Sequence, residues 1–238
     1  MSKTIRIGTR DSELALWQAH TVQKKLNDLG YKTEITAVKS QGDIILDKPL
    51  YELGITGIFT KTLDIAMING QVDIAVHSMK DVPTALPIGI VQAAVLERAN
   101  TLDILVHKGN LDFLNGEGTI ATGSLRRQAQ WLNKYPNHKV VDLRGNVNTR
   151  MQKLQDSNWS GAVFAAAGLE RINFKPSNYI NLDWIIPAPA PGALVIVAMA
   201  HDEFCRDAVA DLNGIDTEVC THIEIQFLTT LAGRCNAP

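Results

Sequence analysis

The sequence lacks several features that would narrow its function at once. Its 238 residues contain only three cysteines, and none of them has the CxxC spacing of a zinc or redox site. The six histidines are scattered without an HExxH pattern, so we expect no metal. No run of about 18 apolar residues is present, so we expect no membrane-spanning helix. A formal net charge of -2 provides no general attraction to nucleic acid or to a membrane surface.

The amino-terminal residues also lack an apolar stretch of signal-peptide length. With an odd number of cysteines and no such signal, structural disulfides are not expected, and the sequence indicates a cytoplasmic, reduced protein. Hydrophobic residues make up 45% of the chain and charged residues 20%, which is ordinary for a globular protein. A chain of 238 residues is long enough for one large domain or for two smaller ones, each with its own core.

Strand and helix signals alternate along the chain, and the pattern starts twice. A short strand at 4–8 precedes an amphipathic helix at 13–29, which Ser12 caps and Gly30 ends. Further strands are expected at 33–38, 72–76, 103–106, 118–121, 140–143 and 162–165, with helices at 60–69, 124–134 and 146–155. Strands separated by helices predict βαβ units and parallel sheets, here two of them.

The proline-rich segment 187–192 indicates a crossover rather than a disordered linker, because it is short and lies between apolar strands. The apolar residues 193–199 that follow predict a buried strand that returns to the first sheet. A last helix is expected at 216–231, ahead of Cys235.

Parallel α/β sheets bind ligands at the carboxyl ends of their strands, in the turns that enter the helices. Five arginines and three small hydroxyl residues lie at such turns of the predicted sheets. They are Arg10, Ser12, Thr122, Ser124, Arg126, Arg127, Arg144 and Arg150. Free N–H groups at a helix start and bidentate guanidinium groups both favour carboxylate or phosphate ligands. Each arginine alone is better explained as a solvated charge at a helix end, but five at such turns favour an anion site.

A second group of polar residues follows the apolar strand that ends at Val76. Asp81, beside Lys80, can stabilise a developing cation there or move a proton. Asp81 can equally be a turn residue before Pro83, which is a common place for aspartate. His77 is not expected to be catalytic, because a hydrogen-bonded structural histidine fits the same position.

Cys235 lies three residues from the end of the chain, where core packing is an unexpected role for a cysteine. An incidental free thiol is one interpretation. An attachment point or a nucleophile is the other, and it depends on surroundings that control the thiolate fraction.

Long stretches of the chain, taken together, resemble the porphobilinogen deaminase (hydroxymethylbilane synthase) family. They lie between Ile7 and Cys235 in the family's order and consist of IGTRDSELALWQA, GDIILDKPL, GIFTK, DIAVHSMKDVPT, GSLRRQAQ, VVDLRGNVNTR, AAAGLERI and FLTTLAGRC. HSMKDVP, GSLRRQ and LRGNVNTR are too long and too specific for a chance match or for a merely shared fold.

The resemblance implies a transferase of tetrapyrrole biosynthesis, which joins four porphobilinogen molecules head to tail into hydroxymethylbilane and releases ammonia at each step. It also implies a dipyrromethane cofactor held by a thioether to Cys235. Asp81 then corresponds to the catalytic aspartate, with Lys80 beside it. The residues that would bind the acetate and propionate arms of cofactor and substrate are Arg10, Ser12, Lys61, Thr122, Ser124, Arg126, Arg127, Arg144 and Arg150.

The fold implied by the resemblance is α/β, with two domains like those of type II periplasmic binding proteins around a cleft and the start of a small third α/β domain. Domain 1 would comprise residues 1–96 and 193–212, and domain 2 residues 100–189. Residues 216–238 would begin the third domain, whose remainder is expected to be absent. A monomer is expected, with porphobilinogen as its small-molecule substrate and neither nucleic acid nor a membrane as a partner.

Several positions differ from the family's pattern. Where the family has PAPGQGA, this chain has Ala190 and Pro191 in place of a flexible glycine and a glutamine. Arg234 replaces a glycine before the cysteine, and Ile225 with Gln226 replaces an arginine-containing stretch. These departures concern activity more than fold. They keep two other functions open, namely an inactive truncated homologue and a non-catalytic cytoplasmic binding protein for a carboxylated ligand.

Overall fold

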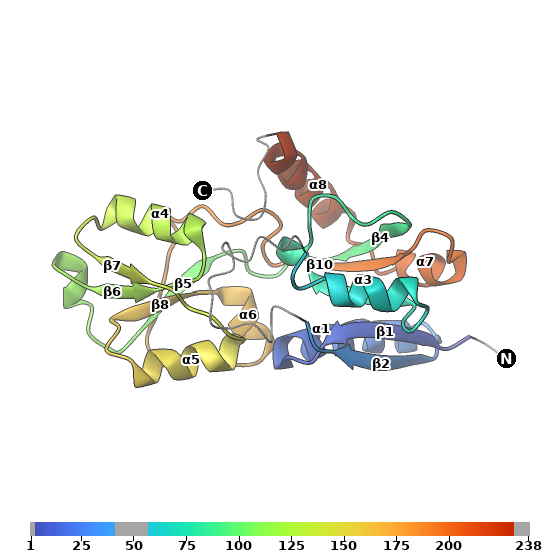
Figure 1. Ribbon diagram of the computed structural model, residues 1–238, viewed down its shortest axis with the longest axis horizontal. Helices are drawn as coiled ribbons and strands as arrows, with labels where there is room; N and C mark the ends of the chain where they lie inside the picture. Colours follow the sequence, from blue (N-terminus) through green and yellow to red (C-terminus); the bar gives the residue numbers. More distant parts are fainter. Residues whose placement is uncertain (1–2, 41–56, 231–238) are drawn as a thin grey trace. The chain divides into compact units, whose positions relative to one another are not determined.

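The computed structural model describes residues 3–40 and 57–230, which form two compact α/β units (Figure 1). The first unit comprises residues 3–40, 57–99 and 189–230, and the second comprises residues 100–188. The chain thus leaves the first unit after Ala99 and re-enters it at Pro189. Arg234, Cys235 and the stretch GDIILDKPL lie outside the described residues.

A five-stranded sheet in the order β2-β1-β3-β10-β4 forms the centre of the first unit. Its strands are β1 (Ile5–Arg10), β2 (Thr33–Val38), β3 (Ile74–Ser78), β4 (Ile90–Leu96) and β10 (Leu194–Met199). β1 runs parallel to β2 and β3, whereas β10 lies antiparallel between β3 and β4. The helices of this unit are α1 (Glu13–Asp28), α3 (Lys61–Ile68), the short 3-10 helix η2 (Met79–Asp81), α7 (Glu203–Ala210) and α8 (Ile215–Thr230).

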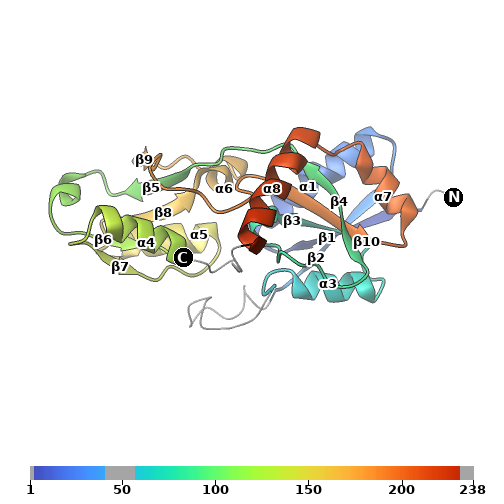
Figure 2. The ribbon, with the colours of Figure 1, turned by 90° about the horizontal axis from the view of Figure 1, so that it is seen from above.

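Helices cover both faces of this sheet, with α1 and α7 on one side and α3 on the other (Figure 2). Ile196 of β10 packs into the same core as Val22 of α1. Its neighbours Val195 and Val197 point the other way and pack into the core that contains Leu63 of α3. Successive side chains of a strand alternate between its faces, so a strand buried on both sides is a continuous apolar run, as residues 193–199 are.

The second unit is built on another five-stranded sheet, in the order β7-β6-β8-β5-β9. Its strands are β5 (Asp103–His107), β6 (Thr119–Ala121), β7 (Lys139–Val141), β8 (Gly161–Ala165) and β9 (Tyr179–Asn181). Its helices are η3 (Asp112–Asn115), α4 (Leu125–Lys134), α5 (Val147–Asp156) and α6 (Ala166–Arg171). β6 is parallel to β7 and β8, and β5 is antiparallel to β8 and β9.

Trp131 fixes α4 on the sheet of the second unit. Its side chain is fully buried, and its indole N–H donates to Nδ1 of His138 at 3.1 Å. Nε2 of His138 lies 2.9 Å from the carbonyl oxygen of Phe113. His138 therefore accepts at Nδ1 and donates from Nε2, which satisfies every polar group of this cluster. This packing holds α4, the helix that carries Arg126 and Arg127, against the sheet.

The structure confirms the α/β class and the return of residues 193–199 to the first sheet. The expected parallel pairing is confirmed for β1 with β2 and β3 and for β6 with β7 and β8, but both sheets are mixed, because β10 and β5 pair antiparallel with their neighbours. Parallel neighbours require a crossover helix, and β10 has none directly before it. β4, β9, α6 and α7 were not expected from the sequence. Within residues 3–40 and 57–230, none of the helices combines the length and the hydropathy that a membrane span requires.

Candidate functional site

The carboxyl ends of β1 and β3 bring two of the predicted motifs to one edge of the first sheet. The two strands are parallel neighbours, with Ile7 opposite Ile74. The turns that follow Arg10 and Ser78 therefore lie side by side. Gln18 of α1 joins them, because its Nε2 donates to Oγ of Ser78 at 2.8 Å.

Arg10 is the last residue of β1, and Ser12 caps α1 as expected. Oγ of Ser12 accepts a hydrogen bond from the backbone N–H of Ala15 at 3.4 Å. The guanidinium carbon of Arg10 lies 4.6 Å from the ring centroid of Phe59, within the range of a cation–π contact. Phe59 is not among the predicted residues, although it lies in the GIFTK stretch. It adds an aromatic face to a set of charged side chains.

Lys80 and Asp81 lie in η2, the turn that directly follows β3. Lys80 is exposed and Asp81 is partly exposed, and Lys61 is exposed at the first position of α3. A Cβ added to Gly57 would lie 3.3 Å from Cγ of Pro83, so the chain entering α3 packs against the end of the Asp81 turn. The structure therefore places the predicted catalytic carboxylate and predicted ligand-binding cations at the same edge of one sheet.

His77, just before Ser78 in β3, is buried and neutral. Burial, reinforced by the charge of Arg10, lowers the pKa of its imidazole from 6.5 to about 4. Within the described part of the chain, its Nε2 has no hydrogen-bond partner. A buried imidazole of this kind does not deliver a proton near neutral pH, which leaves Asp81 as the accessible ionisable acid of this turn.

In the second unit, the carboxyl ends of the parallel neighbours β6 and β7 present the other two predicted motifs. Ser124 caps α4 by accepting a hydrogen bond from the backbone N–H of Arg127 at 3.4 Å. Asn146 caps α5 with its side chain in the same way. A Cβ added to Gly123 would lie 2.7 Å from the carbonyl oxygen of Leu143, so the two turns are in contact. Thr122 lies at the start of the first of these turns.

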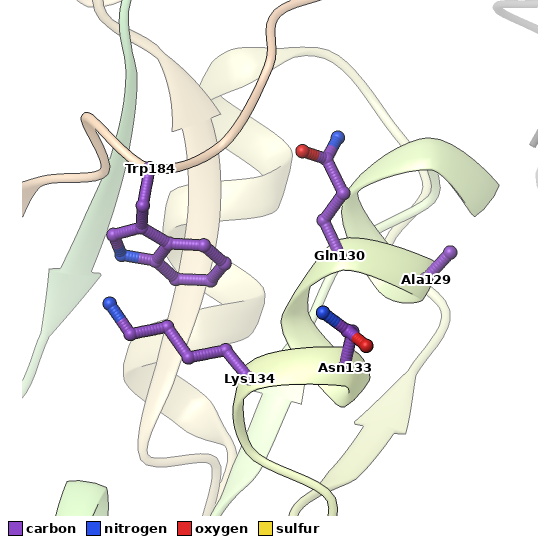
Figure 3. A pocket seen from close by; sticks show the side chains of 5 residues that line it. All are labelled: Ala129, Gln130, Asn133, Lys134 and Trp184. Carbon is purple, nitrogen blue, oxygen red and sulfur yellow. The ribbon is translucent and has the colours of Figure 1, made fainter.

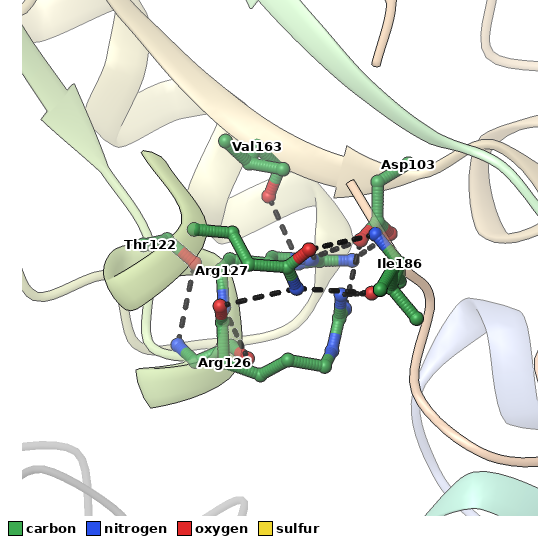
Figure 4. Close-up of polar contacts among 8 residues, drawn as sticks. Asp103, Thr122, Arg126, Arg127, Val163 and Ile186 are labelled. Atoms are coloured by element: carbon green, nitrogen blue, oxygen red, sulfur yellow. Dashed lines mark hydrogen bonds and ion pairs between the residues drawn. The ribbon is translucent and has the colours of Figure 1, made fainter. Parts of the chain in front are cut away.

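Asp103, at the start of β5, binds Arg127 through both of its carboxylate oxygens (Figure 4). Nη2 of Arg127 donates to Oδ1 at 2.6 Å, and Nε donates to Oδ2 at 3.1 Å. Nη1 donates to the carbonyl oxygen of Val163 at 3.1 Å. Every nitrogen of this buried guanidinium thus has a partner inside the unit. Arg127 therefore has a structural role, because it connects the start of α4 to β5 and β8.

Arg126 shares the carboxylate of Asp103 but lies closer to solvent. Its Nη2 donates to Oδ2 of Asp103 at 2.8 Å, and its Nη1 donates to the carbonyl oxygen of Ile186. The side chain of Arg126 is 18% exposed, compared with 9% for Arg127. Burial alone would raise the pKa of Asp103, but the charges and hydrogen bonds of Arg127 and Arg126 outweigh it and lower the pKa. The ionised Asp103 therefore offsets one of the two positive charges.

Arg144 and Arg150 flank the start of α5. Nε of Arg150 donates to the carbonyl oxygen of Gly145 at 2.7 Å, and Nζ of Lys153 donates to that of Arg144 at 3.1 Å. Arg144 is buried and Arg150 is half-buried. A third arginine, Arg171, ends α6 and is buried, which lowers the pKa of its guanidinium. Arg171 is absent from the predicted set, although it lies in the AAAGLERI stretch.

A hollow of about 580 Å³ lies beside α4, and its lining consists of Ala129, Gln130, Asn133, Lys134 and Trp184 (Figure 3). Nζ of Lys134 lies 4.3 Å from a ring centroid of Trp184. Gln130 exchanges two hydrogen bonds with the backbone of Ile186. These groups are therefore already engaged, and none of the predicted site residues lines this hollow.

A smaller hollow of about 160 Å³ separates the segment after Asp81 from α8. Met79 and Val82 line it from one side, and His222 and Ile225 line it from α8. Ile225 also packs against the core that contains Met79. At this position, where the family's pattern has a charged stretch, the chain therefore has an apolar contact with the core that supports the Asp81 turn.

One group of potential metal ligands occurs among the described residues, formed by Asp73, Asp202 and Cys205. Two cations already bind it, because Nζ of Lys3 lies 2.7 Å from Asp202 and Nη2 of Arg6 lies 2.7 Å from Asp73. Burial, with the hydrogen bond and negative charge of Asp202, raises the pKa of the Cys205 thiol to about 12. A protonated thiol between ion pairs is a poor metal ligand, so the group is an internal charge network.

Residues 5–207 match the family model for porphobilinogen deaminase, dipyromethane cofactor binding domain. The chain belongs to the porphobilinogen deaminase family. This confirms the predicted resemblance, and with it the enzyme class and the dipyrromethane cofactor.

Relatives in the porphobilinogen deaminase family come from distant organisms. The porphobilinogen deaminase of Chlorobium phaeobacteroides is 40% identical, with 100% of this chain and 78% of that protein covered. The chloroplastic enzyme of Oryza sativa subsp. japonica is 42% identical, with 98% and 68% covered. A probable porphobilinogen deaminase of Methanocaldococcus jannaschii is 42% identical, with 98% and 80% covered. Each alignment includes nearly the whole of this chain.

Solved structures confirm the predicted fold class. An ancestral cationic amino acid solute binding protein has a TM-score of 0.57 at 14% identity, with 94% of each chain covered. The probable amino-acid ABC transporter extracellular-binding protein of Bacillus subtilis has a TM-score of 0.53 at 13% identity, with 96% of this chain and 97% of that chain covered. At these identities the likeness concerns the fold of type II periplasmic binding proteins and not their ligands.

Proposed function

We propose that this chain joins porphobilinogen molecules head to tail into hydroxymethylbilane, with release of ammonia, on a dipyrromethane cofactor bound through a thioether to Cys235. One observation carries the residue assignment: Asp81 follows β3 at the same sheet edge where Arg10 ends β1. Membership of the family supports the reaction. The roles of individual side chains are the proposal.

The side chains present suit a ligand with several carboxylates. In the first unit, Arg10 and Lys80 lie next to the start of α1, where free N–H groups also favour an anion. In the second unit, Arg126 and Arg150 lie at the starts of α4 and α5. We assign these four cations, together with Lys61, to the acetate and propionate arms of cofactor and substrate. When bound, the cofactor supplies the pyrrole end to which the first porphobilinogen is joined.

The carboxylate of Asp81 is assigned to the pyrrole that becomes positively charged when ammonia leaves. A fixed negative group close to developing positive charge lowers the barrier to that step. The same oxygen can accept the proton that the pyrrole loses after the new bond forms. Lys80 beside it donates hydrogen bonds to a carboxylate arm. Lys80 thus binds negative charge on the ligand, whereas Asp81 stabilises positive charge.

The test is Asp81→Ala, with Asp183→Ala as a control because Asp183 is an exposed aspartate of the other unit. We expect hydroxymethylbilane formation to fall by about 100- to 1,000-fold, as on removal of an electrostatic stabiliser. Intact mass should still show the two-pyrrole adduct, which Cys235→Ser should lose. Wild-type turnover by Asp81→Ala would exclude Asp81 from the mechanism. A bare polypeptide mass together with reversible porphobilinogen binding would instead indicate a binding protein.

Arg126 and Arg127 need separate substitutions. Because Arg127 supports the sheet edge from within, a change there tests stability as well as binding. Arg126→Leu is therefore the cleaner test of ligand retention, and we expect it to weaken porphobilinogen binding at least about tenfold. Unchanged binding would remove Arg126 from the site. We further propose that the protein acts in the cytoplasm, as a monomer, on a small-molecule substrate. Sedimentation of the purified protein tests whether it is a monomer.

A further inference from the structure

His77 of β3 is a buried histidine that lacks the hydrogen bonds which burial normally requires. The residue is 6% exposed, and Nε2 of its imidazole has no hydrogen-bond partner within residues 3–40 and 57–230. Most buried polar atoms of side chains have a partner, because an unpaired one loses its hydration without compensation. His138 shows the usual arrangement, since both of its ring nitrogens have partners. The structure therefore does not support the expected role of His77 as a hydrogen-bonded structural histidine.

His77 lies on the face of the first sheet that α3 covers. It pairs with Val195 of β10, and paired residues of neighbouring strands point to the same face. Val195 packs in the core that contains Leu63 of α3, and so does Ala75, two residues before His77. Because His77 is the last residue but one of β3, its imidazole lies at the carboxyl edge of this face.

Arg10 of β1 lies beside His77 on the same face. The two strands are parallel with Gly8 opposite Ala75, so counting along both strands places Arg10 opposite His77. Burial, and then the positive charge of Arg10, lower the pKa of His77 to about 4, which keeps the imidazole neutral next to a guanidinium. Arg10 also contacts the ring of Phe59, just before α3. A neutral imidazole and a cation therefore lie side by side at this edge.

The start of α3 also favours an anion at this face. Its N-cap residue, Thr60, makes no side-chain hydrogen bond to the first turn. Lys61, the first helical residue, is unfavourable at this end, because the N–H groups of a first turn have partial positive charge. Asp64 of the same turn is buried, which raises the pKa of its carboxyl and disfavours the charged form. A bound carboxylate would offset the positive charge of Arg10, Lys61 and the first turn.

We infer that His77 is a ligand-binding residue, whose Nε2 donates a hydrogen bond to the carboxylate arm of a pyrrole ligand that Arg10 holds. The neutral imidazole carries one N–H, and a carboxylate at Nε2 selects the tautomer with the proton there. Because Nε2 is buried in the free chain, the half-buried side chain of Arg10 must turn aside as it takes up the carboxylate. The unpaired nitrogen then gains in the complex the partner that it lacks in the free chain. The choice of ligand rests on the proposed function.

His77→Leu tests this inference through two effects of opposite sign. Leucine has a similar volume and removes the unpaired polar atom, so the full chain should unfold about 2–4 °C higher at a pH above 6.5. Porphobilinogen binding should nevertheless weaken by about 10- to 100-fold, because a hydrogen bond to a charged group is lost. Calorimetry on the full chain in a Cys235→Ser background measures this affinity, since the thiol proposed for attachment is then absent.

His138→Leu and His77→Gln are the matched controls. Both ring nitrogens of His138 have partners, so His138→Leu should instead lower the unfolding temperature by at least about 2–4 °C. His77→Gln keeps an N–H at a similar distance from the backbone and should bind porphobilinogen within about threefold of the chain that retains His77. In that chain, the nitrogen NMR signal of Nε2 of His77 should move to the position of a protonated ring nitrogen when porphobilinogen is added.

Unchanged porphobilinogen affinity in His77→Leu, or a fall in its unfolding temperature like that of His138→Leu, would overturn the inference. If the wild-type chain binds porphobilinogen but forms no hydroxymethylbilane, the proposed function fails. The affinities of the two His77 variants then still decide whether His77 binds the carboxylate. A wild-type chain with no affinity for porphobilinogen would refute both.

Discussion

Arg127 donates hydrogen bonds to both carboxylate oxygens of Asp103, at 2.6 Å and 3.1 Å, across 24 positions of sequence. The side chains are only 9% and 5% exposed. A buried ion pair adds little to stability when compared with apolar residues of the same shape, because both charges lose their hydration. Removing one partner is different, since it leaves the other charge buried and uncompensated.

We therefore expect Asp103→Asn to destabilise the second unit by about 3–5 kcal/mol. Two guanidinium groups would then face each other without the carboxylate that offsets them. Urea unfolding followed by tryptophan fluorescence reports mainly on this unit, which contains three of the four tryptophans, Trp131 among them. Asp183→Asn, at an exposed position, is the control and should change stability little. Equal stability of the two variants would show that Asp103 is dispensable.

The buried His77 predicts a loss of stability in mild acid. Its pKa is about 4 in the folded protein and 6.5 as a free side chain, so between these values only the unfolded chain binds the proton. Stability is thus fully present above pH 6.5 and falls as the pH drops towards 4, by up to about 1.4 kcal/mol per pH unit. His77→Asn should flatten this part of the profile, while His201→Asn, at an exposed position, should not. Parallel profiles for all three proteins would contradict the assignment.

Ala190→Gly should stabilise the first unit, because glycine adopts the φ of +54° without a steric penalty. The gain is limited to about 1 kcal/mol, since glycine also increases the entropy of the unfolded chain. Asn173 offers a comparison at nearly the same φ of +52°. Asparagine tolerates the left-handed region, so Asn173→Gly should give a smaller gain or none. Thermal unfolding of both variants measures the difference.

Gly123→Ala should disturb the turn that carries Thr122 and Ser124. The added methyl group would lie 2.7 Å from the carbonyl oxygen of Leu143, which is backbone and has little freedom to move. We expect a loss of about 1–3 kcal/mol in stability together with weaker porphobilinogen binding. Gly116→Ala, where the added group meets open space, is the matched control. Normal binding by Gly123→Ala would show that the two turns can separate at no cost.

Much of the fold was predictable because local signals agreed with the tertiary structure. Ser12, Ser124 and Asn146 are caps in the structure, at the starts of helices that the sequence indicates. β4 was missed because prolines and a glycine precede it, and β9 because it has only three residues. The antiparallel pairing of β10 depends on where the chain comes from after the second unit. Residue patterns within the strand contain no such information.

The candidate site was predictable to the extent that it follows from strand ends. Arg10 and Asp81 lie in turns after β1 and β3, and parallel pairing alone brings these turns together. The supports of the site were not predictable. Asp103 meets Arg127 across 24 positions, and Arg98 meets Glu224 across 126 positions, so only the folded chain reveals either pair. Phe59 was within reach, since it lies in a matched stretch beside Lys61.

The placement of β10 constrains the order in which the two units can fold during translation. Its residues, Leu194–Met199, fill the gap between β3 and β4, yet a ribosome makes them only after all of residues 100–188. The sheet of the first unit therefore stays incomplete until β10 has been made, and the apolar edges of β3 and β4 are exposed until then. All residues of the second unit have been synthesised by that point. The second unit is thus the first that can fold completely. A chaperone that acts during synthesis is expected to bind the amino-terminal segment.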